Sequence, residues 1–440
     1  MTYQEALNYL DSFINYEKKD SYDYGASFKL DRMIRLASAL GDPQKGVRSV
    51  HVSGTKGKGS TCAMTHSILK AAGYRTGLYT SPHLVSFRER IRIGDELISE
   101  EDVGKYMETV KKAAEGLGGD RPTFFEAYTA LAFLYFQAKK ADIVVYETGL
   151  GGRLDATNII EPLVSAITPI SYEHTALLGD TLSKIAFEKA GIIKEGSVCV
   201  SAPQEAEALE VIKKSCDERD ASLVLIGRDL SFEEISSGGD SQTFSVKGLF
   251  GEYKNIHTGM LGHHQVVNAA VAIGIIESLR LSGITAGAQA VRKGLGSVKW
   301  PGRLEMINGS PRVLLDGAQN GSSARALSAS VRKLFKYRKL ILVLGVSKDK
   351  DIKGILKELI PISDAVVLTR SRIAQRAADP SYIAGMITPK EKVAAVTESG
   401  KDALDKALSA AAPQDLVLVT GSLFVVGEIR KILLKDTSDE

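Results

Sequence analysis

The sequence predicts an α/β fold, with an N-terminal doubly wound domain of the P-loop type and a smaller, C-terminal Rossmann-like α/β domain. Short apolar runs such as "DIVVYETG" and "LVSAITP" alternate with stretches of helical periodicity, as in parallel sheets covered on both faces. A glycine-rich segment, "HVSGTKGKGS" at residues 51–60, lies between one such strand and one such helix. A second series of strands begins near Trp300, where "GSVKWPGR" interrupts the periodicity. We therefore expect two domains, at residues 1–297 and 298–440.

Two helices are expected before the glycine-rich segment. Thr2 and Glu5 have the spacing of a capping box, and apolar residues at helical spacing continue from them to Ile14. Residues 30–40 place apolar side chains at i, i+3, i+4, i+7 and i+10, and Gly41 ends this second helix. Helical stretches also separate the strands of both domains.

The strands of the first domain are continuous apolar runs, in "SVHVSG", "DIVVYETG", "LVSAITP" and "SVCVSAP". Such runs are typical of parallel strands buried on both faces. Residues 222–260 differ, because short alternating pieces such as "TFSVKG" and "EYKNIHTG" indicate an antiparallel insert or edge. The second domain has its own series, in "RVLLDGA", "KLILVLGV", "AVVLTR", "EKVAAV" and "DLVLVTGS".

Composition narrows the class of protein. The 440 residues include 56 basic and 53 acidic side chains, and this balance indicates neither a nucleic-acid-binding nor a membrane-binding surface. A small anionic ligand is compatible with it, because such a ligand needs only local charge. The three cysteines form no C-x-x-C pair, which favours a reducing cytoplasm over a disulfide framework. The N-terminus lacks a signal-peptide pattern, and no apolar run approaches about 18 residues, so no membrane span is expected.

The glycine-rich segment departs from the strict P-loop pattern, G-x-x-x-x-G-K-[ST]. With Lys58 as its lysine, Val52 stands in place of the leading glycine and Gly59 in place of the hydroxyl residue. The glycines still leave room for backbone N–H groups to surround a phosphate, and the following helix adds a positive N-terminal end. Lys58 is placed to reach the outer phosphates, and Ser60 or Thr61 to bond a phosphate or face a metal. A flexible turn is the alternative, but the strand before and the helix after favour a phosphate site.

Several polar residues follow predicted strands, where ligands bind in open α/β sheets. Glu147 suits Mg²⁺, which prefers oxygen donors shared with phosphates, although a helix cap or a solvated acid fits equally. Arg153 and Asp155 lie in the same loop, where they either contribute to the site or only form a salt bridge with each other. His174 and Asp316 follow strands of the two domains, with a structural histidine and a cap for the next helix as their alternatives. Such positions across two domains predict an interdomain cleft.

Nine segments together resemble the folylpolyglutamate synthase/dihydrofolate synthase branch of the Mur ligase family, over nearly the whole chain. They are "HVSGTKGKGST", "YTSPHLVSFRERIRI", "TFFEAYTALAF", "ETGLGGRLDATN", "HTALLGDTLSKIAFEKAGIIK", "GHHQVVNAAVA", "WPGR", "DGAQN" and "LVLGVSKDKD". Their order and spacing are jointly specific, whereas a single glycine-rich loop is not.

This resemblance implies an ATP-dependent amide ligase. ATP would phosphorylate a folate-type carboxylate to an acyl phosphate, which the amine of L-glutamate then attacks with release of phosphate. Extension of folate tails is the expected reaction, and conversion of dihydropteroate to dihydrofolate is a second activity left open. The alternatives are a Mur-type ligase that acts on another carboxylate and a nucleotide-binding regulator without chemistry. We also expect a cytoplasmic monomer that acts on small molecules, with no nucleic acid or membrane as a partner.

The resemblance also implies roles for individual residues. The ATP phosphate loop corresponds to Gly57, Lys58, Gly59 and Ser60, and the other nucleotide contacts to Asn268, Arg303 and Asp316. The ligands of two Mg²⁺ ions correspond to Ser81, Glu147 and His174. The pterin-side pocket corresponds to Phe125, Glu126, Arg153, Leu154 and Asp155, with Leu30, Asp31 and Arg32 as further candidates. Lys189 matches a carbamylated lysine whose negative charge would help to place the second ion, and Lys58, Lys189 and His174 are the expected catalytic residues.

Three positions depart from the pattern of this family. Lys56 stands where bacterial members commonly have Asn, and Glu173 where Asp usually precedes the histidine. Gln319 replaces a usual His near the transferred phosphoryl group, so we expect ligation to survive with an altered pH dependence or substrate preference. His263 and His264 are adjacent and point apart, so we expect them to begin the helix that follows rather than to share a metal.

Overall fold

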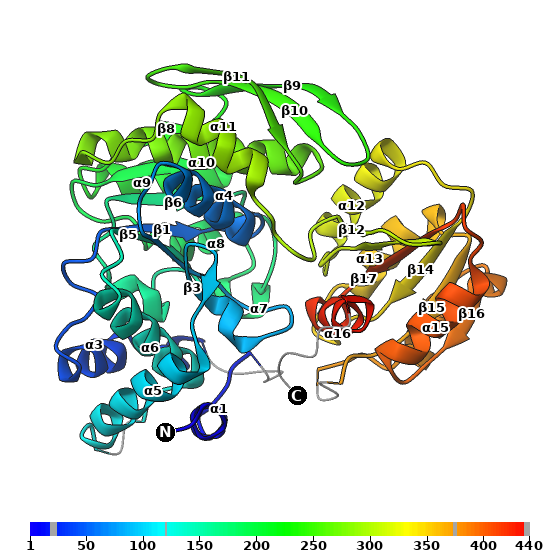
Figure 1. Cartoon of the computed structure of the whole chain (residues 1–440), viewed down its shortest axis with the longest axis horizontal. Coiled ribbons are helices and arrows are strands. Elements are labelled where there is room, and N and C mark those ends of the chain that lie inside the picture. The colour runs from blue at the N-terminus through cyan, green and yellow to red at the C-terminus, as the bar shows by residue number, and fades with distance from the viewer. Residues whose placement is uncertain (18–23, 119–120, 373–375, 435–440) are drawn as a thin grey trace.

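The computed structural model describes residues 1–17, 24–118, 121–372 and 376–434, which form two lobes side by side (Figure 1). The first lobe contains an eight-stranded sheet and a separate three-stranded sheet, and the second lobe contains a six-stranded sheet. Helices cover both faces of the larger sheets (Figure 1). The predicted α/β class, with a larger N-terminal and a smaller C-terminal part, is confirmed.

The eight-stranded sheet has the order β4-β3-β2-β5-β1-β6-β7-β8, and β3 is the one strand that runs against the others, because it pairs antiparallel with both β2 and β4. The strands are β1 (Ser49–Ser53), β2 (Thr76–Tyr79), β3 (Ile91–Ile93), β4 (Glu96–Leu97), β5 (Ile143–Glu147), β6 (Val164–Ile167), β7 (Val198–Ser201) and β8 (Ser222–Leu225). Alternate residues pack into different clusters, with Val50 and Val145 in one and Val144 and Tyr146 in the other. Both faces are therefore buried, as the continuous apolar runs predict.

One face of this sheet is covered by α4 (Lys58–Ala71), α10 (His263–Leu279) and α11 (Ala288–Ser297). The opposite face carries α1 (Tyr3–Asp11), α3 (Leu30–Ala39), α5 (Glu100–Glu115) and α6 (Phe124–Ala138) in one cluster, and α8 (Leu182–Ala190) and α9 (Ala206–Asp217) in another. Two short helices, α2 (Tyr24–Ser27) and α7 (Thr175–Leu178), lie between these elements in the chain.

The first helix is shorter than its apolar spacing predicts. The capping box is present, with the Glu5 N–H bonded to Thr2 Oγ1 and the Thr2 N–H bonded to Glu5 Oε2. However, α1 ends at Asp11, and Ile14 lies beyond it with half of its surface exposed. Ile14 instead lines the cavity between the lobes, so its position is decided by the site rather than by the helix.

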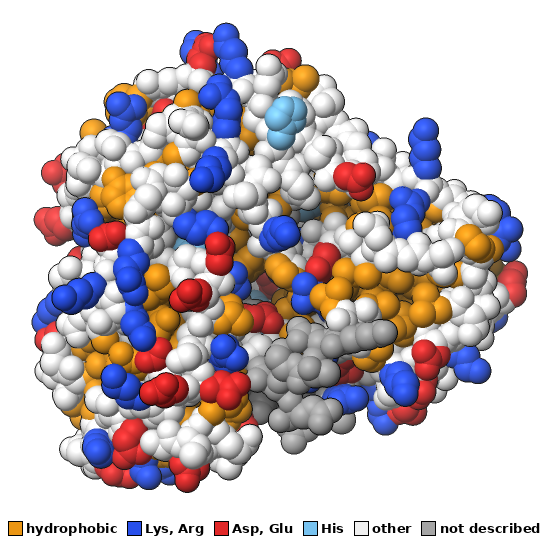
Figure 2. Space-filling view, in the orientation of Figure 1, with side chains coloured by type: hydrophobic (Ala, Val, Ile, Leu, Met, Phe, Trp, Pro, Cys, Tyr) orange, Lys and Arg blue, Asp and Glu red, His pale blue; other side chains and the backbone are white. Residues whose placement is uncertain are grey.

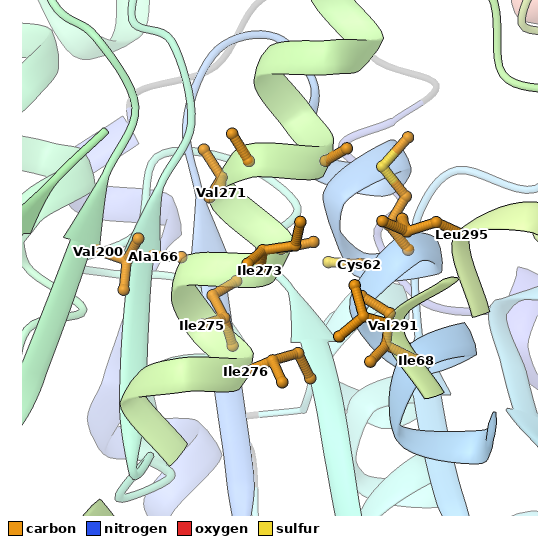
Figure 3. Close-up of a cluster of buried hydrophobic side chains, with 14 of the residues drawn as sticks. Cys62, Ile68, Ala166, Val200, Val271, Ile273, Ile275, Ile276, Val291 and Leu295 are labelled. Atoms are coloured by element: carbon orange, nitrogen blue, oxygen red, sulfur yellow. The ribbon is translucent and has the colours of Figure 1, made fainter. Parts of the chain in front are cut away.

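The helix α10 is apolar on every side because other elements surround it (Figure 3). Ala166 and Val200 of the sheet lie on one side of it, and Ile68 of α4 and Val291 of α11 on the other. Within the described part of the chain, residues 263–282 form one helix that is long and apolar enough to cross a membrane by length and composition, and 78% of its most apolar window is buried inside the protein. Burial in the core accounts for this composition.

The three-stranded sheet confirms the antiparallel insert expected within residues 222–260. Its strands are β9 (Ser231–Ser237), β10 (Gln242–Lys247) and β11 (Glu252–Thr258). Residues 222–225 do not belong to it, because they form β8 at the edge of the large sheet, parallel to β7. The β9–β10 hairpin reaches the second lobe, where a Cβ added at Gly239 would lie 3.6 Å from Leu334 O.

The second lobe has the strand order β12-β13-β17-β14-β15-β16, with β12 antiparallel and the others parallel. The strands are β12 (Glu305–Ile307), β13 (Arg312–Leu315), β14 (Leu340–Leu344), β15 (Ala365–Leu368), β16 (Val393–Val396) and β17 (Leu416–Thr420). The helices are α12 (Gly321–Leu334), α13 (Ile352–Leu359), α14 (Pro380–Met386), α15 (Gly400–Ala410) and α16 (Leu423–Leu434). The chain passes from α11 to β12 through residues 298–304.

Candidate active site

Four neighbouring strands deliver the predicted site residues to one edge of the first sheet. β1 leads into the phosphate loop, residues 54–60. Ser81 follows β2, Glu147 ends β5 and His174 follows β6. Since β2, β5, β1 and β6 are parallel neighbours, their carboxyl ends meet at the same edge. The second lobe faces this edge across a hollow with charged side chains of both signs at its centre (Figure 2).

The phosphate loop presents backbone N–H groups from the first turn of α4. The N–H groups of residues 55 and 56 are bonded to Pro169 O, both at 3.1 Å. The Thr61 N–H bonds to Gly57 O at 2.8 Å, which begins the intrahelical ladder. Helix geometry leaves the N–H groups before this point without intrahelical partners, so those of residues 57–60 are suited to an anion.

Gly57 and Asn268 fit against each other. The backbone of Gly57 has a φ of 86°, in the left-handed region. A Cβ at this position would lie 2.2 Å from Asn268 Oδ1, so a larger residue has no room. Asn268 is buried in α10, and its Nδ2 donates to Gln265 Oε1 at 2.9 Å. The structure thus brings a predicted nucleotide contact directly against the phosphate loop.

Glu147 is a buried carboxylate at the end of β5. Its Oε2 accepts a hydrogen bond from the Ser81 N–H at 3.2 Å, which joins two of the predicted metal ligands. Burial raises the pKa of Glu147, and the positive charge of Lys58 is the strongest influence that lowers it. Because burial disfavours the charged form of Glu147, a further cation beside the carboxylate would stabilise it.

His174 adopts an uncommon backbone conformation at the start of α7. Its φ of 52° and ψ of 38° lie in the left-handed region, which few residues other than glycine occupy. Burial, together with the nearby Lys350 ammonium group, lowers the pKa of His174 to about 4. The imidazole is therefore neutral at pH 7 and retains a lone pair that can act as a ligand.

Lys189 is buried in α8, and its Nζ donates to Gly54 O at 2.7 Å. Burial, and then the positive charge of Lys58, lower the pKa of Lys189 to about 7. Near neutral pH, a large fraction of this side chain is therefore an uncharged amine, which is the nucleophilic form.

The donor set at this edge fits Mg²⁺. Glu147 offers a buried carboxylate, His174 a neutral imidazole and Ser81 a hydroxyl group. Among the described residues, no three His, Cys, Asp or Glu side chains form a group that could hold a metal ion. The residues therefore suit a cation that keeps several waters and shares phosphate oxygens, as Mg²⁺ does, rather than one held by an all-protein cage.

A cavity of about 220 Å³ lies between the lobes. Part of its lining comes from the first lobe, and includes Ser81 and His174 together with four predicted pterin-side residues, Phe125, Glu126, Leu154 and Asp155. The second lobe contributes Gln319, Lys350 and Arg376. The structure thus brings the predicted substrate residues beside the predicted metal ligands.

Arg153, the fifth predicted pterin-side residue, points elsewhere. It pairs with Glu188 of α8 at 2.8 Å, and its guanidinium lies 5.5 Å from the centroid of the Phe187 ring. The alternative of a salt bridge within the loop is wrong, because the partner of Arg153 lies outside the loop. Asp155 instead accepts bonds from the N–H groups of residues 149 and 150, at 2.8 and 3.0 Å, and so holds the turn.

Glu126 is held by Arg32, through a 2.6 Å bond from Nε and a 2.7 Å bond from Nη2. Its carboxylate also accepts the Thr123 N–H at 2.7 Å, as part of the capping box of α6. Of the further substrate-site candidates, which lie in α3, Arg32 therefore reaches the cavity through Glu126. Lys29, immediately before that helix, lines the cavity as well.

Asp316 shapes the loop that follows β13. Its carboxylate accepts the N–H groups of Leu304 and Ala318, both at 2.9 Å, and burial raises its pKa. The alternative role as a helix cap is wrong, because Asn320 caps α12. The Arg303 guanidinium lowers the pKa of Asp316, so these two predicted nucleotide contacts lie close together.

A second cavity, of about 330 Å³, is adjacent to the first. Its lining includes Gly59, Glu147 and Arg303, so predicted ATP-site residues of both lobes meet there. Ser81 lines both cavities. The phosphate-loop side and the substrate side of the site therefore meet at the predicted metal ligands.

Sequence reasoning missed most of the cavity residues from the second lobe, including the two cations Lys350 and Arg376. Lys350 lies in "LVLGVSKDKD", where a concentration of charge directly after a buried strand was the available signal. Arg376 had no comparable signal, because its place depends on distant segments. It donates to Glu17 O and pairs with Asp349 at 2.8 Å.

These features define a class of protein. A phosphate loop on a central parallel strand binds a nucleotide, a buried acid and a neutral imidazole lie beside it, and a second α/β lobe completes the cavity. This is the arrangement of a two-domain nucleotide-dependent ligase. Residues 52–276 match the Mur ligase middle domain, and residues 302–423 match the Mur ligase, glutamate ligase domain.

Relatives and solved structures narrow the class further. The chain is 37% identical over 421 residues to the dihydrofolate synthase/folylpolyglutamate synthase of Bacillus subtilis, across 93% of this chain and 96% of the relative. A Mycobacterium tuberculosis folylpolyglutamate synthase complexed with ADP and AMPPCP is 33% identical, with a TM-score of 0.86 over 93% of this chain and 96% of that one. An FPGS–AMPPCP–folate complex is 30% identical, with a TM-score of 0.84 over 99% and 100% of the two chains. The chain belongs to the folylpolyglutamate synthase/dihydrofolate synthase branch of the Mur ligase family.

Proposed function

We propose that the chain is an ATP-dependent ligase that adds L-glutamate to a folate-type carboxylate through an acyl phosphate. Tetrahydrofolate polyglutamylation is the main reaction, and dihydropteroate is a further candidate substrate. The observation that carries the proposal is the position of Ser81. It lines both the 330 Å³ cavity beside Gly59 of the phosphate loop and the 220 Å³ cavity between the lobes, which we call the interdomain cavity. A phosphate and a carboxylate bound in these cavities would meet beside Ser81, Glu147 and His174.

The phosphate loop would bind the nucleotide. The N–H groups of residues 57–60 and the positive end of α4 bind phosphate oxygens, and Lys58 neutralises the outer phosphates as a point charge. Asn268, against the loop, and Arg303, in the second cavity, would hold the rest of the nucleotide.

Ser81, Glu147 and His174 would hold Mg²⁺, which when bound supplies positive charge to the phosphate oxygens. The low pKa of His174 keeps its imidazole available as a ligand at neutral pH. The uncharged amine of Lys189 would add to CO₂ and lose a proton, which forms a carbamate. This change would place a negative charge next to Gly54, where it would attract a second cation.

The chemistry is then a matter of position and charge. A carboxylate oxygen of the folate bonds to the γ-phosphorus, the bond to the ADP oxygen breaks, and an acyl phosphate remains. The glutamate nitrogen bonds to the acyl carbon, phosphate leaves with the acyl C–O bond pair, and the nitrogen gives up a proton. Positioned groups contribute most in such transfers. Gln319 lines the cavity between the lobes from the second lobe. Its amide can donate a hydrogen bond there but cannot take up a proton near neutral pH.

The substrate would lie in the interdomain cavity. Phe125 and Leu154 offer apolar surface to an aromatic ring system, and Glu126 is fixed by Arg32 to accept hydrogen bonds. Lys350 and Arg376 bring positive charge from the second lobe toward the carboxylates of the substrates. The proposal includes a cytoplasmic monomer of two domains, 1–297 and 298–440, which sedimentation and separate expression of the domains would test.

One assay tests this function. Phosphate release is measured with ATP, Mg²⁺ and L-glutamate, with tetrahydrofolate and with dihydropteroate as acceptors. Release with either acceptor supports the proposal, and no release with both overturns it. Release only with an unrelated carboxylate identifies the alternative Mur-type ligase, which the neutral Gln319 favours. ATP binding without any turnover identifies a regulator.

A further inference from the structure

Glu173, immediately before His174, collects polar groups from three separate segments. Its Oε2 pairs with Lys56 Nζ at 2.9 Å. Its Oε1 accepts a hydrogen bond from Asn320 Nδ2 at 3.1 Å and lies 3.8 Å from Lys350 Nζ. The side chains of Glu173 and Lys350 are only 12% and 10% exposed, so little water is available to replace a lost partner.

The three partners lie in the phosphate loop and in the second lobe, which ligation must hold in a fixed position relative to each other. Lys56 lies in the phosphate loop. Asn320 caps α12 and directly follows Gln319, which lines the interdomain cavity. Lys350 lies in the segment between β14 and α13 and lines the same cavity. One carboxylate therefore ties the phosphate loop to two segments of the second lobe.

Charge explains why a carboxylate is needed at this point. Lys56 and Lys350 approach it from opposite lobes, so its removal would leave two ammonium groups facing each other at the interface. Lys350 also lies 3.7 Å from Asp349. Within the described residues, Glu173 is the acid that pairs with Lys56.

A second ion pair between the lobes provides a comparison. Glu234 of β9 pairs with Lys333 of α12 at 2.5 Å, and His263 lies 3.3 Å from the same carboxylate. This pair also links the lobes, but it involves neither the phosphate loop nor the interdomain cavity. The Lys333 side chain is 59% exposed, so solvent weakens the pair.

We propose that Glu173 is a positioning residue that seats the second lobe on the phosphate loop, so that nucleotide binding and the placement of Gln319 and Lys350 are coupled. This inference rests on the proposed ligase function. The carboxylate of Glu173 contacts Lys56 of the phosphate loop and both Asn320 and Lys350 of the second lobe, so one side chain holds the two lobes together at the site.

The test uses Glu173→Gln, Lys56→Gln and the double variant in the full chain, with Glu234→Gln as the matched control. Steady-state kinetics give kcat and the KM for ATP and for L-glutamate. Small-angle scattering, with and without AMPPCP, reports closure of the lobes. We expect AMPPCP to compact the wild type but not Glu173→Gln, and we expect Glu173→Gln to raise the KM for L-glutamate by about tenfold. The double variant should be less impaired than Glu173→Gln, because it also removes the Lys56 ammonium group that Glu173→Gln leaves without its carboxylate partner.

Three outcomes would overturn the inference: equal effects of Glu173→Gln and Glu234→Gln, simple additivity in the double variant, or no AMPPCP-induced compaction in the wild type. Absence of ligation by the wild type would contradict the proposed function alone, because the scattering comparison needs only nucleotide binding. If Glu173→Gln does not fold, Glu173→Asp replaces it. The shorter arm should raise the same KM by a smaller factor, and an unchanged KM would count against the coupling.

Discussion

Replacement of Gly57 by Ala tests the fit between the phosphate loop and α10. The new Cβ would lie 2.2 Å from Asn268 Oδ1, so the loop or Asn268 must move by roughly 1 Å. Alanine at a φ of 86° costs about 1–2 kcal/mol. A displaced Asn268 also loses its bond to Gln265, which contributes about 1 kcal/mol. We therefore expect the free energy of unfolding to fall by about 2–3 kcal/mol.

The same displacement should weaken ATP binding. A charge-assisted bond from one loop N–H to a phosphate contributes about 1.5–3 kcal/mol, so the loss of one such bond weakens binding by about tenfold or more. Urea unfolding measures the stability, and calorimetric titration with AMPPCP measures the affinity. Gly41→Ala is the matched control, because Gly41 has a φ of 81° and nothing within 4 Å of its added Cβ.

The control variant should lose only the left-handed cost of about 1–2 kcal/mol and keep the affinity of the wild type. Adding Asn268→Ala to Gly57→Ala should recover part of the lost stability, because it removes the atom that the Cβ meets. The reasoning is refuted if Gly57→Ala matches Gly41→Ala in both stability and affinity.

The ionisable groups of the fold give four more expected outcomes. Lys58→Ala should reduce phosphate release by about 100-fold or more, and unchanged ligation would contradict the phosphate-loop assignment. Glu147→Gln should raise the Mg²⁺ concentration that gives half of the maximal rate by about tenfold, as measured in a Mg²⁺ titration at saturating ATP. An unchanged midpoint would show that Glu147 is not a metal ligand. With a pKa of about 7 for Lys189, carbamate formation should increase with pH. In CO₂-depleted buffer the rate should therefore be lower at about pH 6 than at about pH 8 and recover with bicarbonate, whereas Lys189→Met should show no recovery. Buried His51 and His174, with pKa values lowered to about 3 and about 4, stay neutral in the fold and gain protons on unfolding. The free energy of unfolding should thus fall as pH drops below about 6.5, and a flat profile from denaturant titrations would show that these histidines are not buried neutral groups.

Local patterns predicted the fold class and the phosphate loop well. The order strand, glycine-rich loop and helix is set by consecutive residues, and the N–H groups offered by residues 57–60 follow from the start of α4. Periodicity was less reliable where two environments produce the same pattern. Ile14 has helical spacing but lines a cavity beyond α1, and residues 222–225 look like an insert but extend the large sheet.

The sequence by itself determined which segments are strands, helices and loops, because these depend mainly on neighbouring residues and on the alternation of apolar side chains. Only the tertiary structure decided the partners of the charged groups. Arg153 pairs with Glu188 rather than within its own loop, and Glu173 joins Lys56 to the second lobe. The physical reason is that a side chain pairs with whatever the packing of distant elements places beside it, and burial then makes that pairing strong enough to shape the site.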